Sequence, residues 1–211
     1  MAILDLHTHH VPPQPEGIVS VAPRAIPSPD IFPGQCYSVG IHPWDVKGVA
    51  LSEEEARLLR EVAAREDVVA VGETGVDRVR HGVAPLAGQL NAFRIHAELA
   101  EELCKPLVIH CVKGHDAIIA LKRAMKPRQP WIIHGFRGKP SVMRMFAGEG
   151  IYLSFGVLFN SDSLIEAPSE LILAETDEAP VTIRNVIAGL SAVCPDVTPD
   201  LIAANMRSLF S

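Results

Sequence analysis

Residues 68–73, Val-Val-Ala-Val-Gly-Glu, show the pattern that decides the fold: a short apolar run, rich in β-branched residues, that ends at a polar side chain. Such runs recur along the chain and alternate with segments of helical periodicity, which is typical of βαβ units around a parallel sheet. The expected strands are Ile3–His7, Ile18–Ala22, Tyr37–Ile41, Val68–Gly72, Leu107–His110, Trp131–His134, Ile151–Phe155 and Leu171–Ala174. Because a closed (β/α)8 barrel has eight strands, the sequence predicts an α/β fold, a distorted TIM-like barrel that forms a single domain over residues 1–211.

The segments between the expected strands differ in their ability to form helices. Ser52 and Glu55 form a capping box, and residues 86–103 place apolar side chains on one helical face. The segment 11–35 instead holds many prolines, which remove backbone donors and clash with the preceding helical turn. These prolines are Pro12, Pro13, Pro15, Pro23, Pro27, Pro29 and Pro33. We therefore expect one or two early helices of the barrel to be missing.

Composition limits the class of protein. The chain has 211 residues, a formal net charge of −6 and no dense block of Lys or Arg, which argues against broad electrostatic wrapping of nucleic acid. No apolar run approaches the roughly 20 residues that cross a bilayer, and the N-terminus lacks the features of a secretion signal. We expect a cytoplasmic protein without membrane contact, and the sequence does not allow a protein partner to be predicted. Without CxxC spacing, we expect reduced core thiols at Cys36, Cys104, Cys111 and Cys194.

The motif Asp5-Leu6-His7-Thr8-His9 contains the first candidate metal ligands. Alternate side chains of a strand share a face, so Asp5, His7 and His9 are expected to project into the barrel. Two imidazoles at this spacing can chelate one cation. The alternative is a surface histidine cluster, since His10 follows directly.

Four more potential ligands each follow an apolar run: Glu73, His110, His134 and Asp177. Buried charged or imidazole groups are costly unless they are paired or bind metal, and a barrel gathers the carboxyl ends of its strands at one rim. With His7 and His9, these residues predict a site for two divalent ions. Glu73 is expected to bridge them across roughly 3.5–4 Å. Imidazole-rich ligation favours zinc, with magnesium or manganese as alternatives.

Other polar and aromatic residues near the expected rim have two readings each. Lys113, Arg137 and Lys139 follow His110 or His134 closely and either hold phosphate oxygens or are solvated loop charges. Trp44 and Phe136 either stack on a base or pack inside the fold. Asp5 and Asp77 are candidates to orient a ligand histidine. The histidines interpreted as structural or surface residues are His10, His81, His96 and His115.

The chain resembles the TatD family of metal-dependent deoxyribonucleases, within the amidohydrolase superfamily. The matching strings are DLHTH, YSVGIHPWD, VGETGVD, KPLVIHC, WIIHGFRG, YLSFG, LAETDEAP and NMRSLF. The resemblance implies the same six metal ligands, with Asp177 accepting a proton from the attacking water. It also implies that His42 lies near the substrate phosphate; the alternative is a strand-end histidine bonded to backbone. The chain is shorter than typical members, and Arg78 replaces an aromatic often found there, which leaves the substrate less defined than the metal chemistry.

We therefore expect a metal-dependent hydrolase that cleaves phosphodiester bonds, with DNA as a substrate contacted through its backbone. Asp177 and Glu73 are the expected catalytic residues, and His42, Lys113 and Arg137 the expected substrate-binding residues. One alternative is a hydrolase of a small amide, ester or phosphate ester, which the acidic net charge favours. Another is a metal-binding protein without turnover. The six expected ligands leave coordination positions open on the two ions, which is typical of catalytic sites and argues against this alternative.

Overall fold

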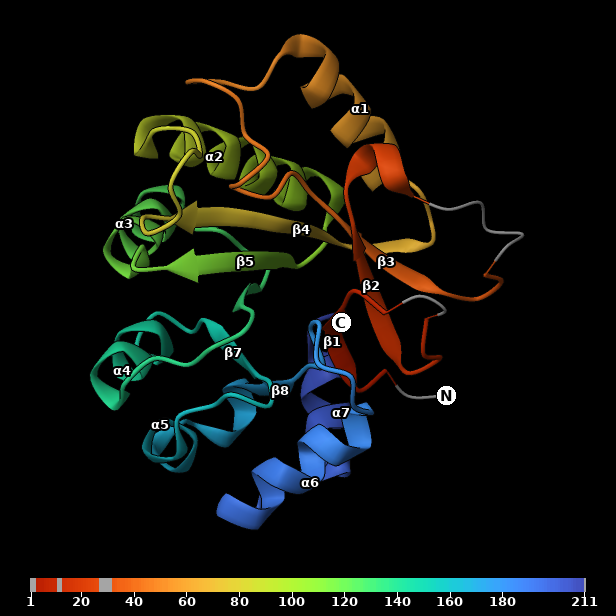
Figure 1. Cartoon of the computed structure of the whole chain (residues 1–211), viewed down its shortest axis with the longest axis vertical. Helices are drawn as coiled ribbons and strands as arrows, with labels where there is room; N and C mark the ends of the chain where they lie inside the picture. The colour runs from red at the N-terminus through yellow and green to blue at the C-terminus, as the bar shows by residue number, and fades with distance from the viewer. Residues whose placement is uncertain (1–2, 11–12, 27–31, 211) are drawn as a thin grey trace. The chain divides into compact units, whose positions relative to one another are not determined.

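The computed structural model describes residues 3–10, 13–26 and 32–210. In this part of the chain eight strands follow one another in the order β1 to β8, and the strand pairs are parallel (Figure 1). The strands are β1 (Asp5–Thr8), β2 (Gly17–Val21), β3 (Cys36–Val39), β4 (Val68–Asp77), β5 (Leu107–Val112), β6 (Trp131–Ile133), β7 (Tyr152–Phe155) and β8 (Ile172–Ala174). The helices are η1 (Pro23–Ala25), α1 (Glu53–Ala63), α2 (Leu86–Leu103), α3 (His115–Met125), α4 (Pro140–Ala147), α5 (Ser161–Glu166), η2 (Ser169–Leu171), α6 (Ile183–Val193) and α7 (Pro199–Ser208).

All eight predicted strands are present in the described residues, although some of their ends differ. Strand β4 continues through Glu73 to Asp77, so Glu73 lies inside a strand and does not follow one. The predicted capping box of α1 and the bounds of α2 are confirmed. The expected loss of early helices is also confirmed: the described residues between β1 and β2 hold no helix, and those between β2 and β3 hold only η1. Pro12, Pro27 and Pro29 lie outside the described residues.

The chain divides into two compact units. Unit 1 comprises the described residues of 1–19 and 132–211, and unit 2 comprises those of 20–131. A single domain over 1–211 stays a prediction. No described helix has the length and apolar character needed to cross a membrane.

The four cysteines are free, as predicted, but they are not core thiols. Cys104 is exposed at the carboxyl end of α2, and the other three are half-buried. Cys104 has a left-handed backbone conformation, with φ 53°, and ends the helix. The predicted free thiols are therefore confirmed, whereas their expected position in the core is wrong.

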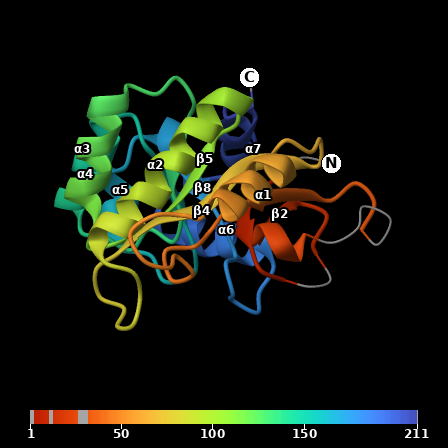
Figure 2. The same ribbon diagram turned by 90° about the horizontal axis from the view of Figure 1, so that it is seen from above.

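In unit 2, β3, β4 and β5 form a parallel sheet, and α1 and α2 pack on β4 (Figures 1 and 2). Phe93 of α2 packs edge-on against Trp131, with ring centroids 5.2 Å apart. Gly75 on β4 lies opposite His110 on β5 and has φ +142°. A Cβ atom at this position would lie 2.1 Å from the carbonyl oxygen of His110. Only glycine therefore allows β4 to pass this close to His110.

In unit 1, β7 pairs with β8 and with Ile132–Ile133 of β6, and β1 pairs with the first residues of β2. The segment that follows β8 returns to β1 through a parallel bridge between Thr8 and Asp177. Helix α7 packs on β8 and α4 packs on β7. These pairings place the carboxyl ends of β6 and β8, and the segment after β8, within unit 1 together with the end of β1.

His96 is a fully buried histidine in α2 that fixes the backbone after β3. The amide N–H of Ile41 donates to Nε2 of His96 at 2.9 Å, so the ring hydrogen lies on Nδ1, which donates to the carbonyl oxygen of Ala92 at 2.7 Å. Burial lowers the pKa of His96 to about 4, outweighing the opposite effect of the Ala92 hydrogen bond. His96 is therefore a structural residue, as the sequence indicated, and its hydrogen bond fixes the backbone of Ile41, the residue before His42.

This buried imidazole predicts an acid sensitivity of the fold. Between about pH 6.5 and about pH 4 the unfolded chain binds a proton at His96 that the folded chain does not, so stability is retained at neutral pH and falls on acidification. We expect His96 to account for a loss of about 2 kcal/mol between about pH 7.5 and about pH 5. Urea denaturation of metal-free protein measures this loss.

A His96→Gln variant should be less stable at neutral pH but lose less stability on acidification. His81 is exposed, so His81→Gln is the matched control and should keep the wild-type pH dependence. An unchanged pH dependence in His96→Gln would show that His96 does not titrate as the structure indicates.

Candidate metal centre

The backbone of Asp177 is paired with β1 and the residue that follows it, which brings the Asp177 side chain to His7 and His9. The amide nitrogen of Asp177 donates to the carbonyl oxygen of His7 at 2.9 Å, and the amide nitrogen of His9 donates to the carbonyl oxygen of Asp177 at 3.1 Å. Asp177 has φ 54°, in the left-handed region that Asp tolerates better than most residues. Two backbone hydrogen bonds thus fix these three residues relative to one another.

The side chains of these three residues converge on one point in unit 1. Nε2 of His7 lies 3.1 Å from Nε2 of His9, and the two nitrogens lie 4.0 and 3.9 Å from Oδ1 of Asp177. Tetrahedral zinc with bonds of about 2.0–2.1 Å holds its ligand atoms about 3.3 Å apart, so the donor set and its spacing fit a transition-metal ion. His7 is fully buried, whereas the side chains of His9 and Asp177 are 38% and 27% exposed. The cluster is therefore accessible from solvent on one side.

His134 joins the same cluster from the end of β6. Its ring centroid lies 4.3 Å from that of His7. Its Nδ1 lies 3.4 Å from Oε1 of Glu175, a fully buried carboxylate that accepts a hydrogen bond from the amide of Gly135 at 2.6 Å. Glu175 was not predicted from the sequence. The available signal was a second acidic residue two positions before Asp177, directly after the apolar run of β8.

Asp5 is buried in unit 1 and fastens the segment that carries Asp177. Its two carboxylate oxygens accept hydrogen bonds from the amide and the hydroxyl of Thr176, at 2.9 and 2.6 Å. Burial raises the pKa of Asp5 to about 7, despite the opposing effect of these hydrogen bonds. Asp5 therefore acts on the position of Asp177 through the backbone.

A second cluster of potential ligands lies in unit 2. Oε1 of Glu73 lies 2.8 Å from Nδ1 of His110 and 3.1 Å from Nε2 of His42. Each of the three residues offers an atom within 4.8 Å of the others, an arrangement that could hold a metal ion. The sequence predicted Glu73 and His110 as ligands, and assigned His42 to the substrate. His42 lies directly against the Glu73 carboxylate, and its contact with the substrate stays a prediction.

Asp77 lies at the end of β4, next to His110, as the sequence suggested. Its Oδ2 is 3.6 Å from Nε2 of His110 and accepts a hydrogen bond from the indole nitrogen of Trp44 at 2.8 Å. Burial alone would raise the pKa of Asp77, but hydrogen bonds from Trp44, Arg80 and Val79, together with His110, lower it below the usual value. Asp77 is therefore an anionic group beside a candidate ligand.

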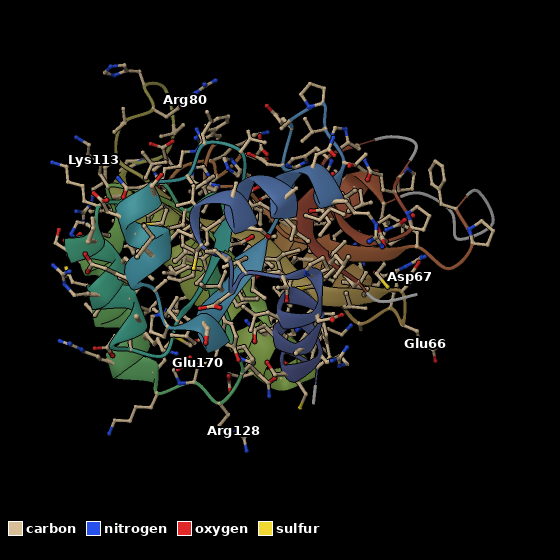
Figure 3. The ribbon with its side chains drawn as sticks, turned by 90° about the horizontal axis from the view of Figure 1, so that it is seen from below. Glu66, Asp67, Arg80, Lys113, Arg128 and Glu170 are labelled. Atoms are coloured by element: carbon tan, nitrogen blue, oxygen red, sulfur yellow. The ribbon has the colours of Figure 1, made fainter. Side chains whose placement is uncertain are left out.

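The remaining predicted site residues differ in their placement. Lys113, Arg137 and Lys139 are exposed, and Lys113 extends outward from unit 2 in Figure 3. Phe136 is buried and packs on Phe146 and Phe155, with ring centroids 6.2 and 5.7 Å away. The stacking interpretation of Phe136 is therefore wrong, because its ring is part of the core.

The histidines interpreted as structural or surface residues take several positions. Nε2 of His10 lies 2.8 Å from the carbonyl oxygen of Ala179 and connects the β1 end with the loop after Asp177. His115 opens α3, as predicted, and His81 is exposed. Of the six predicted ligands, unit 1 thus gathers His7, His9, His134 and Asp177, and unit 2 gathers Glu73 and His110.

Solved structures share this fold over nearly the whole chain. The TatD homologue YJJV from Escherichia coli k12 is similar with a TM-score of 0.82 and 19% identity, over 99% of this chain and 97% of that one. A TatD family hydrolase from Entamoeba histolytica has a TM-score of 0.77 and 14% identity, over 100% and 98% of the two chains. The predicted TIM-like (β/α)8 fold is confirmed.

Sequence comparison identifies the family. The model for TatD related DNases matches residues 23–208, and the chain therefore belongs to that family. The 3′-5′ ssDNA/RNA exonuclease TatD of Erwinia billingiae is 29% identical over 84% of this chain and 78% of its own length. The uncharacterized metal-dependent hydrolase YabD of Bacillus subtilis is 32% identical over 66% of this chain, which matches only 57% of that relative. The predicted family and the class of metal-dependent hydrolases are confirmed.

The unit 1 cluster predicts a specific loss of metal when a ligand is removed. His9→Ala should lower the zinc content and weaken zinc binding by at least about tenfold, because it removes one of three converging donors. The neighbouring His10→Ala is the matched control and should retain the metal, since its ring lies against a backbone oxygen. Metal analysis after dialysis measures both. Equal zinc retention in the two variants would contradict the ligand assignment.

Proposed function

We propose that this chain hydrolyses phosphodiester bonds of single-stranded nucleic acid and binds two divalent ions. The observation that carries the proposal is the convergence of His7, His9 and Asp177 within about 4 Å of one another in unit 1. The proposed ligands are His7, His9, Glu73, His110, His134 and Asp177. The relatives named as ssDNA/RNA exonucleases support the substrate class. We also propose a cytoplasmic location, on the sequence features alone.

Bound divalent ions would lower the pKa of water and neutralise charge on the phosphoryl oxygens. Zinc is the preferred ion because the donors are mainly imidazoles. The protein side chains would accept the proton and orient the imidazoles. Asp177 is partly exposed and is the proposed acceptor of the proton from the attacking water. Glu73 is nearly buried and holds both His42 and His110, so its charge fixes the orientation of two imidazoles.

Basic residues on exposed loops are the proposed contacts to the substrate backbone. Arg78 donates to both carboxylate oxygens of Asp116 and to the carbonyl oxygen of Lys113, and thereby fixes the loop that carries Lys113. Lys113 and Arg137 extend from loops that directly follow β5 and β6. Contacts to phosphate carry no base sequence information, so we expect cleavage with little sequence preference.

A small ester or amide substrate is the second candidate. The observation in its favour is the formal net charge of −6. This candidate predicts turnover of small phosphate esters or amides and no measurable affinity for oligonucleotides.

Hydrolysis of an end-labelled single-stranded oligonucleotide tests the proposal. We expect activity that chelation abolishes and that zinc, manganese or magnesium restores. Asp177→Asn should lower kcat by roughly 100- to 10 000-fold, because it removes the proposed proton acceptor. Asp196 is exposed, so Asp196→Asn is the matched control and should retain wild-type activity. Chelator-resistant activity, or equal kcat in the two variants, would overturn the proposal.

A further inference from the structure

Trp44 is a partly exposed indole that is held in one orientation. The residue is 44% exposed, and its ring nitrogen donates a hydrogen bond to Oδ2 of Asp77 at 2.8 Å. Its backbone amide donates to Nδ1 of His42 at 3.2 Å. The contacts therefore indicate a surface kept in place beside His42.

The same anchor fixes a cation over the indole. Oδ1 of Asp77 accepts hydrogen bonds from the amides of Val79 and Arg80, at 2.8 and 3.0 Å. The guanidinium carbon of Arg80 lies 4.1 Å from the centroid of the Trp44 ring. Figure 3 shows Arg80 on a loop at the outer surface. One carboxylate thus holds an aromatic ring and the backbone of its cationic neighbour in a fixed arrangement.

Trp44 also lines a cavity of about 700 Å³ within unit 2. The cavity has apolar walls from Ile41, Val46 and Ala84. Its lining also holds charged residues of both signs: Arg24, Lys47, Asp45 and Glu55. Its volume lies in the range of small-molecule sites, which combine apolar walls with a few polar groups. A flat, largely apolar ligand fits the apolar part of this lining.

The ring of Trp44 is next to the unit 2 ligand cluster. Its centroid lies 4.6 Å from that of His42 and 5.8 Å from that of His110. A group bound in the cavity against Trp44 is therefore adjacent to the residues that surround the Glu73 carboxylate.

We propose that Trp44 and this cavity form a nucleobase subsite, which stacks the base of the nucleotide whose phosphate lies at the His42, Glu73 and His110 cluster. This inference rests on the proposed function and names a part of its substrate-binding site. Base–aromatic stacking tolerates every base, so the subsite adds affinity without sequence readout. Arg80 adds a cation–π partner at the same ring.

Fluorescence tests the subsite without catalysis. The chain has two tryptophans, and Trp131 is fully buried, so quenching by an added base reports on Trp44. Titration of the full chain with deoxyadenosine 5′-monophosphate should give saturable quenching. Deoxyribose 5-phosphate lacks the base and should give none. In Trp44→Phe the remaining signal should not respond to the nucleotide.

Kinetics test the same subsite on the substrate. Two oligonucleotides are compared that differ only in the terminal residue, which carries a base in one and is an abasic tetrahydrofuran in the other. The wild-type KM should be about 5- to 100-fold lower for the base-bearing substrate, and this ratio should fall toward one in Trp44→Ala. The exposed Val49 of the same loop gives the control, because Val49→Ala should keep the wild-type ratio.

The outcomes separate this inference from the proposed function. Quenching without hydrolysis of either oligonucleotide would support the subsite and contradict the nuclease. Hydrolysis without quenching, and with equal KM values for the two substrates, would support the nuclease and overturn the subsite. A similar loss on both substrates in Trp44→Ala, with the ratio unchanged, would also overturn it, because Trp44 would then act only on the position of His42 and Asp77.

Discussion

The geometry of the unit 1 site depends on the pair of backbone hydrogen bonds that joins Asp177 to His7 and His9. They join residues at opposite ends of the sequence and place the Asp177 carboxylate beside the imidazoles of His7 and His9. Asp5 strengthens this junction through Thr176, the residue before Asp177. Three donors at this spacing favour binding of a cation, and the two backbone hydrogen bonds keep them at that spacing.

Unit 2 reaches a comparable arrangement by different means. Gly75 allows β4 to pass close to His110. The Glu73 carboxylate lies within contact distance of the imidazole nitrogens of His110 and His42. His96 fixes the amide of Ile41, one residue before His42. The buried imidazole of His96 therefore contacts only structural groups among its hydrogen-bond partners, and through Ile41 it helps to position His42. Groups far from the reaction can control how accurately the ligands are placed.

The sequence could predict the strands, the candidate ligands and the family, because buried strands and their polar ends follow simple periodicities. It could not predict where β4 ends, since Glu73 and Asp77 look like loop residues when their partners on β5 are unknown. Phe136 was ambiguous for a related reason: whether an aromatic ring stacks on a ligand or on Phe146 and Phe155 depends on tertiary packing. The roles of Glu175 and Trp44 depend on contacts with Gly135 and Asp77, which no local pattern shows.

Anomalous X-ray diffraction at the zinc edge, from crystals of the zinc-loaded protein, tests the unit 1 site directly. We expect a zinc peak about 2.0–2.2 Å from Nε2 of His7, Nε2 of His9 and a carboxylate oxygen of Asp177. Zinc bound elsewhere, with these three side chains turned away from it, would show that they do not form a metal site.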